Sequence, residues 1–155
     1  MTYTLLIDGP SGSGKTTLAN QIGAALGIRV VHLDDFYPGW GGLAEGARMV
    51  ADDVLDPAAP GFWRWDWEQD RRAEWVPLVP GADLVVEGVG AVTEASISKA
   101  KARGDVDTVR VIAPEETRKA RALKRDPGYA PWWGMWAEQE KRLPALPVDV
   151  EVRRV

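Results

Sequence analysis

A glycine-rich segment near the start of the chain has the spacing of a phosphate-binding loop. Residues 9–16 match G-x-x-x-x-G-K-[ST] at every fixed position. Glycines let successive N–H groups turn toward a phosphate, a lysine adds charge for the outer phosphates, and a threonine hydroxyl can bind Mg²⁺. An apolar run precedes the motif and a helical pattern follows it, which is the context of a nucleotide site rather than of an incidental glycine-rich turn. We expect ATP to be bound by Gly9, Ser11, Gly12, Ser13, Gly14, Lys15, Thr16 and Thr17, and Mg²⁺ to be bound by Thr16.

Carboxylates follow two further apolar runs. Asp34 and Asp35 come after residues 28–33, and Glu87 comes after residues 84–86. Ligands of open parallel sheets bind at the carboxyl ends of the strands, where an aspartate can accept a proton from an attacking hydroxyl. Adjacent side chains of an extended segment point opposite ways, so one of the two aspartates is expected to act. Glu87 is expected to reach Mg²⁺ or its water shell, with a helix cap or a buried pair as the alternative.

Three arginines recur at helical spacing later in the chain. Arg118, Arg121 and Arg125 lie within a strongly charged segment that follows Pro114. Arginine forks bind phosphate oxygens and can neutralise charge on a phosphoryl group during transfer. A charge run of this kind also fits a solvated helix face. Because a phosphate loop is present, we expect the arginines to belong to a lid at about residues 114–130.

Strand and helix patterns alternate along the chain. Strands are predicted at residues 3–8, 28–33, 84–88, 106–113 and 148–155, and helices at 15–26, 92–103, 114–125 and 132–143. A short helix capped by Asp66 is predicted over residues 66–76, whereas residues 43–61 are weakly patterned and contain two prolines. No hairpin is indicated between residues 38 and 82. The alternation predicts an α/β fold with a mostly parallel sheet covered on both faces, as one domain over residues 1–155.

Composition narrows the classes of protein further. The 155 residues include no cysteine, which excludes a disulfide framework, a thiolate zinc site and a cysteine nucleophile. The formal net charge of −4 counts against binding to nucleic acid. The first residues show no signal-peptide pattern and no apolar run long enough to enter a membrane, so a cytoplasmic protein is expected. The segment at 148–155 could be an edge strand, which leaves a homodimer open.

Several of these segments together resemble the uridine kinase family, which includes nicotinamide riboside kinases. The resemblance spans about residues 3–126 and is carried by the phosphate loop and the segments 33–37, 66–68, 86–88 and 117–126. It implies a three-layer P-loop fold with strand order 2-3-1-4-5 and transfer of phosphate from ATP, with Mg²⁺, to a nucleoside hydroxyl. Asp34, the first residue of D-x-F-Y, would be the general base, and Lys15 and the lid arginines would stabilise the transferred group. Tyr37 would shape the acceptor pocket, Asp66 would bind the ribose and Glu87 would lie near Mg²⁺.

The acceptor region, about residues 36–82, departs from the family pattern. The family inserts a base-recognising hairpin after the second strand, and its base-contacting histidine has no counterpart, since His32 lies inside a predicted strand. Indole rings stack well on planar bases, but they also pack against a core. Trp67 is expected at the substrate, near Trp40, Trp63 and Trp65. Two alternatives therefore remain: a sugar or sugar-acid kinase of the gluconate or shikimate type, and an ATP-binding protein without catalysis.

Overall fold

A five-stranded parallel sheet forms the centre of the molecule, as the computed structural model of residues 2–155 shows. Its strands lie in the order β2-β5-β1-β6-β7, and every neighbouring pair is parallel. Counted within this sheet alone, the order is 2-3-1-4-5, so the predicted fold class is confirmed. The strands are β1 (Thr2–Asp8), β2 (Arg29–His32), β5 (Leu84–Glu87), β6 (Gly104–Ile112) and β7 (Val150–Arg153).

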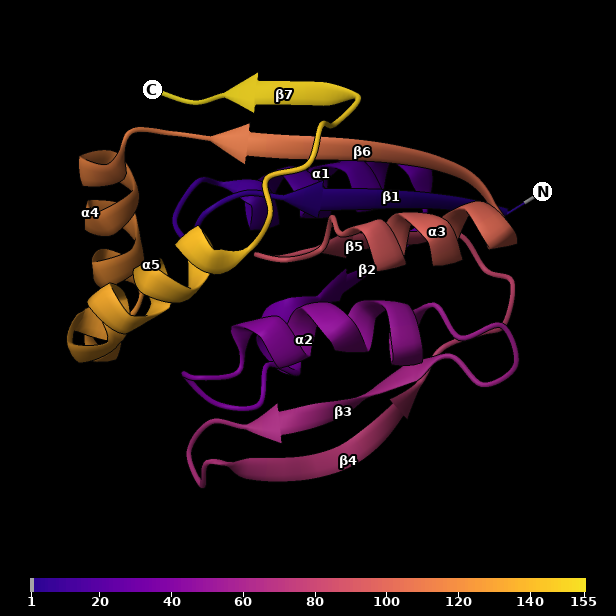
Figure 1. The fold of residues 1–155 in the computed structure, drawn as a ribbon, viewed down its shortest axis with the longest axis horizontal. Helices are drawn as coiled ribbons and strands as arrows, with labels where there is room; N and C mark the ends of the chain where they lie inside the picture. Colours follow the sequence, from indigo (N-terminus) through magenta and orange to yellow (C-terminus); the bar gives the residue numbers. More distant parts are fainter. Residues whose placement is uncertain (1) are drawn as a thin grey trace.

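Helices cover both faces of this sheet. Figure 1 shows α1 (Lys15–Leu26) behind the strands and α3 (Glu94–Arg103) in front of them. Side chains alternate between the two faces of each strand, so Leu5 and Ile7 join a cluster with Ala19 of α1. Leu6 packs on the other side, in the cluster that contains Ala100 of α3. The central strands β1 and β5 are therefore buried on both faces, which is why they appear in the sequence as short continuous apolar runs.

The last helices gather at one end of the sheet. Figure 1 shows α4 (Glu115–Arg125) and α5 (Trp133–Arg142) at the carboxyl ends of β1 and β6. A 3₁₀ segment, η3 (Pro127–Trp132), connects them. The same edge carries the phosphate loop, residues 9–16, between β1 and α1, so α4 and the loop both follow the carboxyl ends of parallel strands.

A β-hairpin replaces the helix that the sequence suggested at residues 66–76. β3 (Gly61–Asp66) pairs antiparallel with β4 (Arg71–Pro77). Cross-strand contacts hold the pair, because the Trp63 and Trp75 rings lie 5.3 Å apart and Arg64 pairs with Glu74 at 2.6 Å. Asp66 accepts hydrogen bonds from the N–H groups that follow it in the turn, so it caps a turn and not a helix. Both the helix and the absence of a hairpin were wrong.

The weakly patterned segment after residue 42 is helical. α2 (Leu43–Met49) continues into a π-helical turn, η2 (Val50–Val54), and the prolines at 57 and 60 come only after it ends. Leu43, Val50 and Val54 are fully buried, so packing against the core stabilises a helix whose own pattern is weak. Figure 1 shows α2 between the sheet and the hairpin. Across residues 2–155, no helix combines the length and the apolarity that crossing a membrane requires.

Candidate active site

The phosphate loop has the conformation that a bound phosphate requires. Gly12 and Gly14 have φ angles of 78° and 98°, a region that favours glycine, and the Ser13 N–H donates to the Pro10 carbonyl at 3.1 Å. Lys15 begins α1 and lies over the loop, with its ammonium 3.4 Å from the Pro10 oxygen. The buried Ser13 hydroxyl has no hydrogen-bond partner among residues 2–155. An unsatisfied hydroxyl in a glycine cradle fits a phosphate oxygen. Thr17 is exposed on α1.

A cavity of about 440 Å³ opens beside this loop, and we name it the loop cavity. Its polar wall combines the phosphate loop with charged groups from the turn after β2 and from the end of α4. Its other wall consists largely of aromatic rings, which come from the segment after β2, the hairpin turn, η3 and α5. The polar residues are Ser11, Lys15, Thr16, Asp34, Arg125 and Asp126, and the aromatic residues are Tyr37, Trp40, Trp67, Tyr129 and Trp136.

Asp34, and not Asp35, lines the loop cavity. A 3₁₀ turn, η1 (Leu33–Asp35), follows β2 and directs the Asp34 side chain toward the phosphate loop. The Trp67 indole donates to the Asp34 carbonyl at 2.8 Å, which ties this turn to the hairpin. Water reaches the Asp34 carboxylate through the cavity, but the surrounding protein desolvates it and raises its pKa, which the charges of Lys15 and Arg125 oppose. A carboxylate with a raised pKa is a stronger base.

Thr16 and Glu87 meet at the base of the loop. The Thr16 hydroxyl donates to Glu87 Oε2 at 2.9 Å, and His32 Nδ1 lies 2.5 Å from the same oxygen. Burial favours the neutral form of Glu87, but the His32 hydrogen bond and the Lys15 charge outweigh it and lower its pKa. The Glu87 bond in turn raises the pKa of His32. Glu87 thus forms a buried pair with His32 and also contacts the Thr16 hydroxyl.

These groups fit a magnesium ion. A hydroxyl and an ionised carboxylate are hard oxygen donors, and Mg²⁺ is usually bound by one or two protein oxygens together with substrate phosphates and water. Thr16 and Glu87 supply such a pair next to Lys15. Within residues 2–155, no three His, Asp or Glu side chains converge on a metal site.

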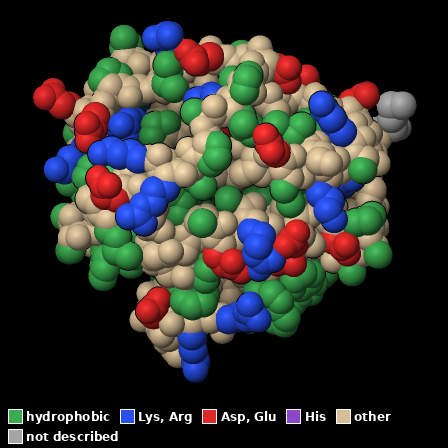
Figure 2. All heavy atoms as spheres, in the orientation of Figure 1, with side chains coloured by type: hydrophobic (Ala, Val, Ile, Leu, Met, Phe, Trp, Pro, Cys, Tyr) green, Lys and Arg blue, Asp and Glu red, His purple; other side chains and the backbone are tan. Residues whose placement is uncertain are grey.

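The three predicted lid arginines have two different positions. Arg118 donates to the carbonyls of Ala113 and Ser11 at 3.0 and 3.3 Å, and Arg121 reaches the Gly12 carbonyl at 3.5 Å. Both therefore hold α4 against the phosphate loop. Only Arg125 lines the loop cavity, across from Asp34. Figure 2 shows several basic side chains on the α4 side of the face in view, with acidic side chains among them.

The structure distributes the predicted substrate residues unevenly. Tyr37 and Trp67 line the loop cavity, and the buried Tyr37 hydroxyl donates to the Val89 carbonyl at 2.6 Å. Asp66 does not line it, because its carboxylate bonds the backbone of the hairpin turn. The expected contact of Asp66 with a ribose therefore has no counterpart in the lining of this cavity and stays a prediction.

Sequence reasoning missed two residues at this edge. Tyr129 lies between α4 and α5, where its hydroxyl donates to Ser11 Oγ at 3.1 Å and its ring stands 4.9 Å from that of Trp40. Glu140 of α5 accepts a hydrogen bond from the Ser11 N–H at 2.7 Å. Neither residue belongs to a spaced motif. The one available signal was a polar residue, Glu140, within the tryptophan-rich helix. A polar residue at such a position is equally typical of a side chain exposed to solvent.

Comparisons with known proteins agree with this fold. No protein-family model matches the chain. Similar solved structures include a candidate fructose transport system kinase from Silicibacter sp. TM1040, with 19% identity, a TM-score of 0.65, and coverage of 97% of this chain and 88% of that one. A sugar kinase from Janibacter sp. HTCC2649 has 20% identity, a TM-score of 0.61, and coverage of 99% and 85%. A candidate uridine kinase from Bacillus stearothermophilus has 22% identity, a TM-score of 0.55, and coverage of 97% and 88%. At these identities the likeness shows the fold, which is that of P-loop kinases.

Proposed function

We propose that the protein transfers a phosphoryl group from ATP to a hydroxyl of a small molecule. The observation that carries the proposal is that Asp34 shares one cavity with Lys15 and Thr16. Phosphoryl transfer needs a donor phosphate, an acceptor hydroxyl and a base for its proton within one space. Binding of a nucleotide alone requires neither a carboxylate of raised pKa nor room for a second molecule beside the loop.

The side chains divide the chemistry among them. The loop N–H groups and Lys15 bind the phosphates, and Asp34 orients the acceptor hydroxyl and takes its proton as the oxygen attacks. Lys15 and Arg125 flank the cavity and neutralise charge on the transferred group, while Arg118 and Arg121 keep α4 in place. A Mg²⁺ ion held by Thr16 and Glu87 supplies further charge neutralisation when bound.

The aromatic wall supports an acceptor with a planar ring, such as a nucleoside. Trp40 is central, since its ring lies within 5.1 Å of the Trp67 ring and 4.9 Å of the Tyr129 ring. Stacking of a base on an aromatic side chain contributes about 1–3 kcal/mol. The resemblance to uridine kinases points the same way. The proposed reaction is therefore that of a uridine kinase-like enzyme.

A sugar or sugar acid is the second candidate acceptor, favoured by similarity to the Janibacter sugar kinase. A sugar lacks the planar face that an aromatic wall binds best, although its C–H face can still contact a ring. Quenching of tryptophan fluorescence separates the two candidates. Nucleosides that quench while sugars do not would favour the nucleoside, and the opposite result would favour the sugar.

Release of ADP from Mg-ATP tests the proposal directly. It is measured without an acceptor, and then with a panel of nucleosides, sugars and sugar acids. We expect one class to stimulate release in the wild type and none to do so in Asp34→Asn, which keeps the size of the side chain but cannot accept a proton. ATP binding without stimulation by any acceptor would leave a nucleotide-binding protein without catalysis.

A further inference from the structure

Ser11 is held by the lid side of the molecule at each of its polar groups. Its carbonyl accepts from Arg118 of α4 at 3.3 Å, and its hydroxyl oxygen accepts from Tyr129 of η3 at 3.1 Å. Its N–H donates to Glu140 of α5 at 2.7 Å. Ser11 lines the loop cavity although only 7% of its surface is exposed. Three consecutive elements thus fix one residue of the phosphate loop.

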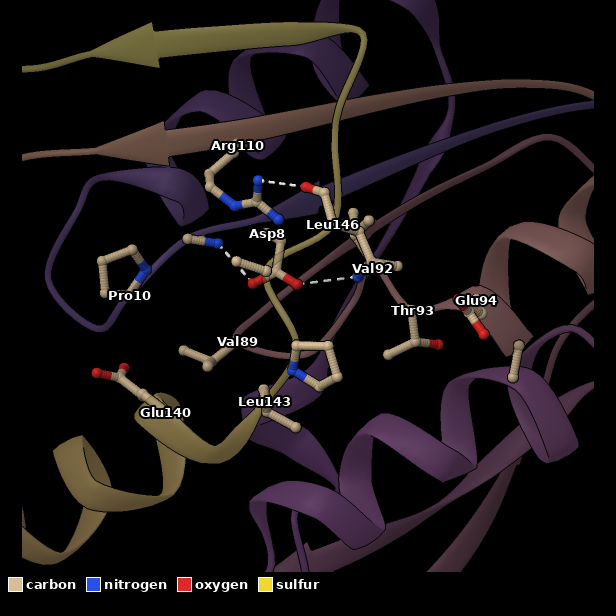
Figure 3. A pocket seen from close by; sticks show the side chains of 14 residues that line it. Asp8, Pro10, Val89, Val92, Thr93, Glu94, Arg110, Glu140, Leu143 and Leu146 are labelled. Carbon is tan, nitrogen blue, oxygen red and sulfur yellow. Dashed lines mark hydrogen bonds between the residues drawn. The ribbon is translucent and has the colours of Figure 1, made fainter.

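Glu140 approaches Ser11 from outside the loop cavity. It lines a second cavity of about 430 Å³, which we name the rear cavity, together with Pro10, Val89 and Leu143. Figure 3 shows the Glu140 carboxylate beside Pro10, on the far side of this cavity from Glu94. Lys15, Thr16 and Asp34 do not line the rear cavity. A phosphate on the loop and the carboxylate on Ser11 can therefore be held at the same time.

The bond is of the strong kind. A carboxylate that accepts from a backbone N–H makes a charge-assisted hydrogen bond, and a loop N–H that loses its only partner away from water is costly. Glu140 is itself partly buried on α5, so the helix limits where its carboxylate can be. The position of the Ser11 peptide is thereby set by α5.

We propose that Glu140 is a positioning residue for phosphoryl transfer, which rests on the proposed function. By fixing the Ser11 peptide, it fixes the wall of the loop cavity that faces the acceptor and so the alignment of the phosphates with Asp34. Reacting atoms must approach to about 3–3.5 Å, and a misplacement of about 1 Å can cost about 100-fold in rate. Glu140 does not line the loop cavity, so we expect its effect in kcat and not in nucleotide affinity.

Three variants of α5 test this role. Glu140→Met keeps the bulk of the side chain but removes the acceptor, and Glu140→Gln keeps an acceptor oxygen without the charge. Glu138→Gln is the matched control, because Glu138 lies on the same helix, is 63% exposed and pairs only with Lys141. We expect kcat of Glu140→Met to fall about 10- to 100-fold with the Kd for ATP nearly unchanged. Glu140→Gln and the control should stay within about threefold of the wild type, since a neutral acceptor still satisfies the N–H.

Exchange of the Ser11 amide hydrogen reports the contact independently of turnover. It should be faster in Glu140→Met than in the wild type, and close to the wild type in Glu140→Gln. Thermal unfolding checks that each variant is folded. If Glu140→Met is not, Glu140→Asp takes its place, because the shorter side chain withdraws the carboxylate from Ser11.

The outcomes separate this proposal from the proposed function. If Glu140→Met, or Glu140→Asp in its place, loses the contact and keeps the kcat of the wild type, the positioning role is overturned. An equal loss of kcat in Glu140→Gln also overturns it, because that result indicates an effect of the charge. Tighter ATP binding in Glu140→Met overturns it too, because the Glu140 carboxylate would then compete with a phosphate. If the wild type turns over no acceptor, the proposed function fails, and unchanged Ser11 exchange in Glu140→Met would then show separately that the contact is absent.

Discussion

Replacing Gly12 by alanine tests the contact between the phosphate loop and α4. Gly12 has a φ angle of 78°, and a Cβ built on it would lie 2.2 Å from the Arg118 carbonyl oxygen and 2.9 Å from the Arg118 Cα. Both atoms belong to the backbone of a helix, so neither can rotate away. The loop or the helix has to move by about 1 Å to relieve the overlap.

The expected cost has two parts. A left-handed conformation costs an alanine roughly 1–2 kcal/mol, and an overpacked contact costs roughly 1–3 kcal/mol more. The sum of about 2–5 kcal/mol corresponds to a fall in Tm of roughly 4–20 °C for a chain of this length. A displacement of about 1 Å between the loop and the helix that carries Arg125 should lower kcat/KM about 100-fold.

Gly27→Ala is the matched control for the strain alone. Gly27 ends α1 with a φ angle of 68°, and nothing lies within 4 Å of an added Cβ. Its Tm should fall by roughly 2–8 °C with kcat/KM unchanged. Thermal unfolding and acceptor-dependent ADP release measure both variants. The reasoning fails if Gly12→Ala loses no more stability than Gly27→Ala and keeps its activity, because the loop and α4 would then not be in contact.

Three further predictions concern the loop cavity. Asp34→Asn should lower kcat about 10²- to 10⁴-fold, because its side chain cannot accept the proton of the acceptor hydroxyl, and a kcat close to that of the wild type would contradict this. For the same reason, wild-type kcat/KM should fall as the pH drops through a pKa above the ordinary 3.8 of an aspartate, and a pH–rate profile with its acid limb at or below that value would refute the assignment. Trp40→Ala should raise KM for a ring-bearing acceptor roughly 5- to 150-fold while the Kd for ATP is kept. Trp63→Ala, on the hairpin outside the cavity, is its control, and equal effects of the two on KM would count against the aromatic wall.

The phosphate half of the site was predictable because its information is local. Gly12, Lys15 and Thr16 lie within one turn and the first residues of α1, so spacing alone determines how they meet. The central strands β1 and β5 were predicted for a similar reason, since burial on both faces leaves short continuous apolar runs. The hairpin was missed because its pairing depends on Trp63 meeting Trp75 across a turn, a contact that no helical or alternating pattern records.

The acceptor half could be predicted only in part, because long-range contacts assemble it. Asp34 was expected at its strand end, but its carbonyl is held by the Trp67 indole, 33 residues further along the chain. Arg118 and Arg121 were expected at the phosphates. In the structure they donate hydrogen bonds to carbonyls of the phosphate loop and so anchor α4 to it. A helical spacing shows that three arginines share a face. It does not show which of them the rest of the fold turns toward the cavity.

The hairpin contributes to the wall of the proposed acceptor site. Its turn lies where Asp66 caps the backbone, which leaves the next residue, Trp67, free to reach back to Asp34 and to the Trp40 ring. Trp40 also stacks on Trp132, with ring planes 6° apart, so the wall extends from the hairpin to the segment after α4. A change in the hairpin turn is therefore expected to alter the position of Asp34 and the aromatic wall of the loop cavity together.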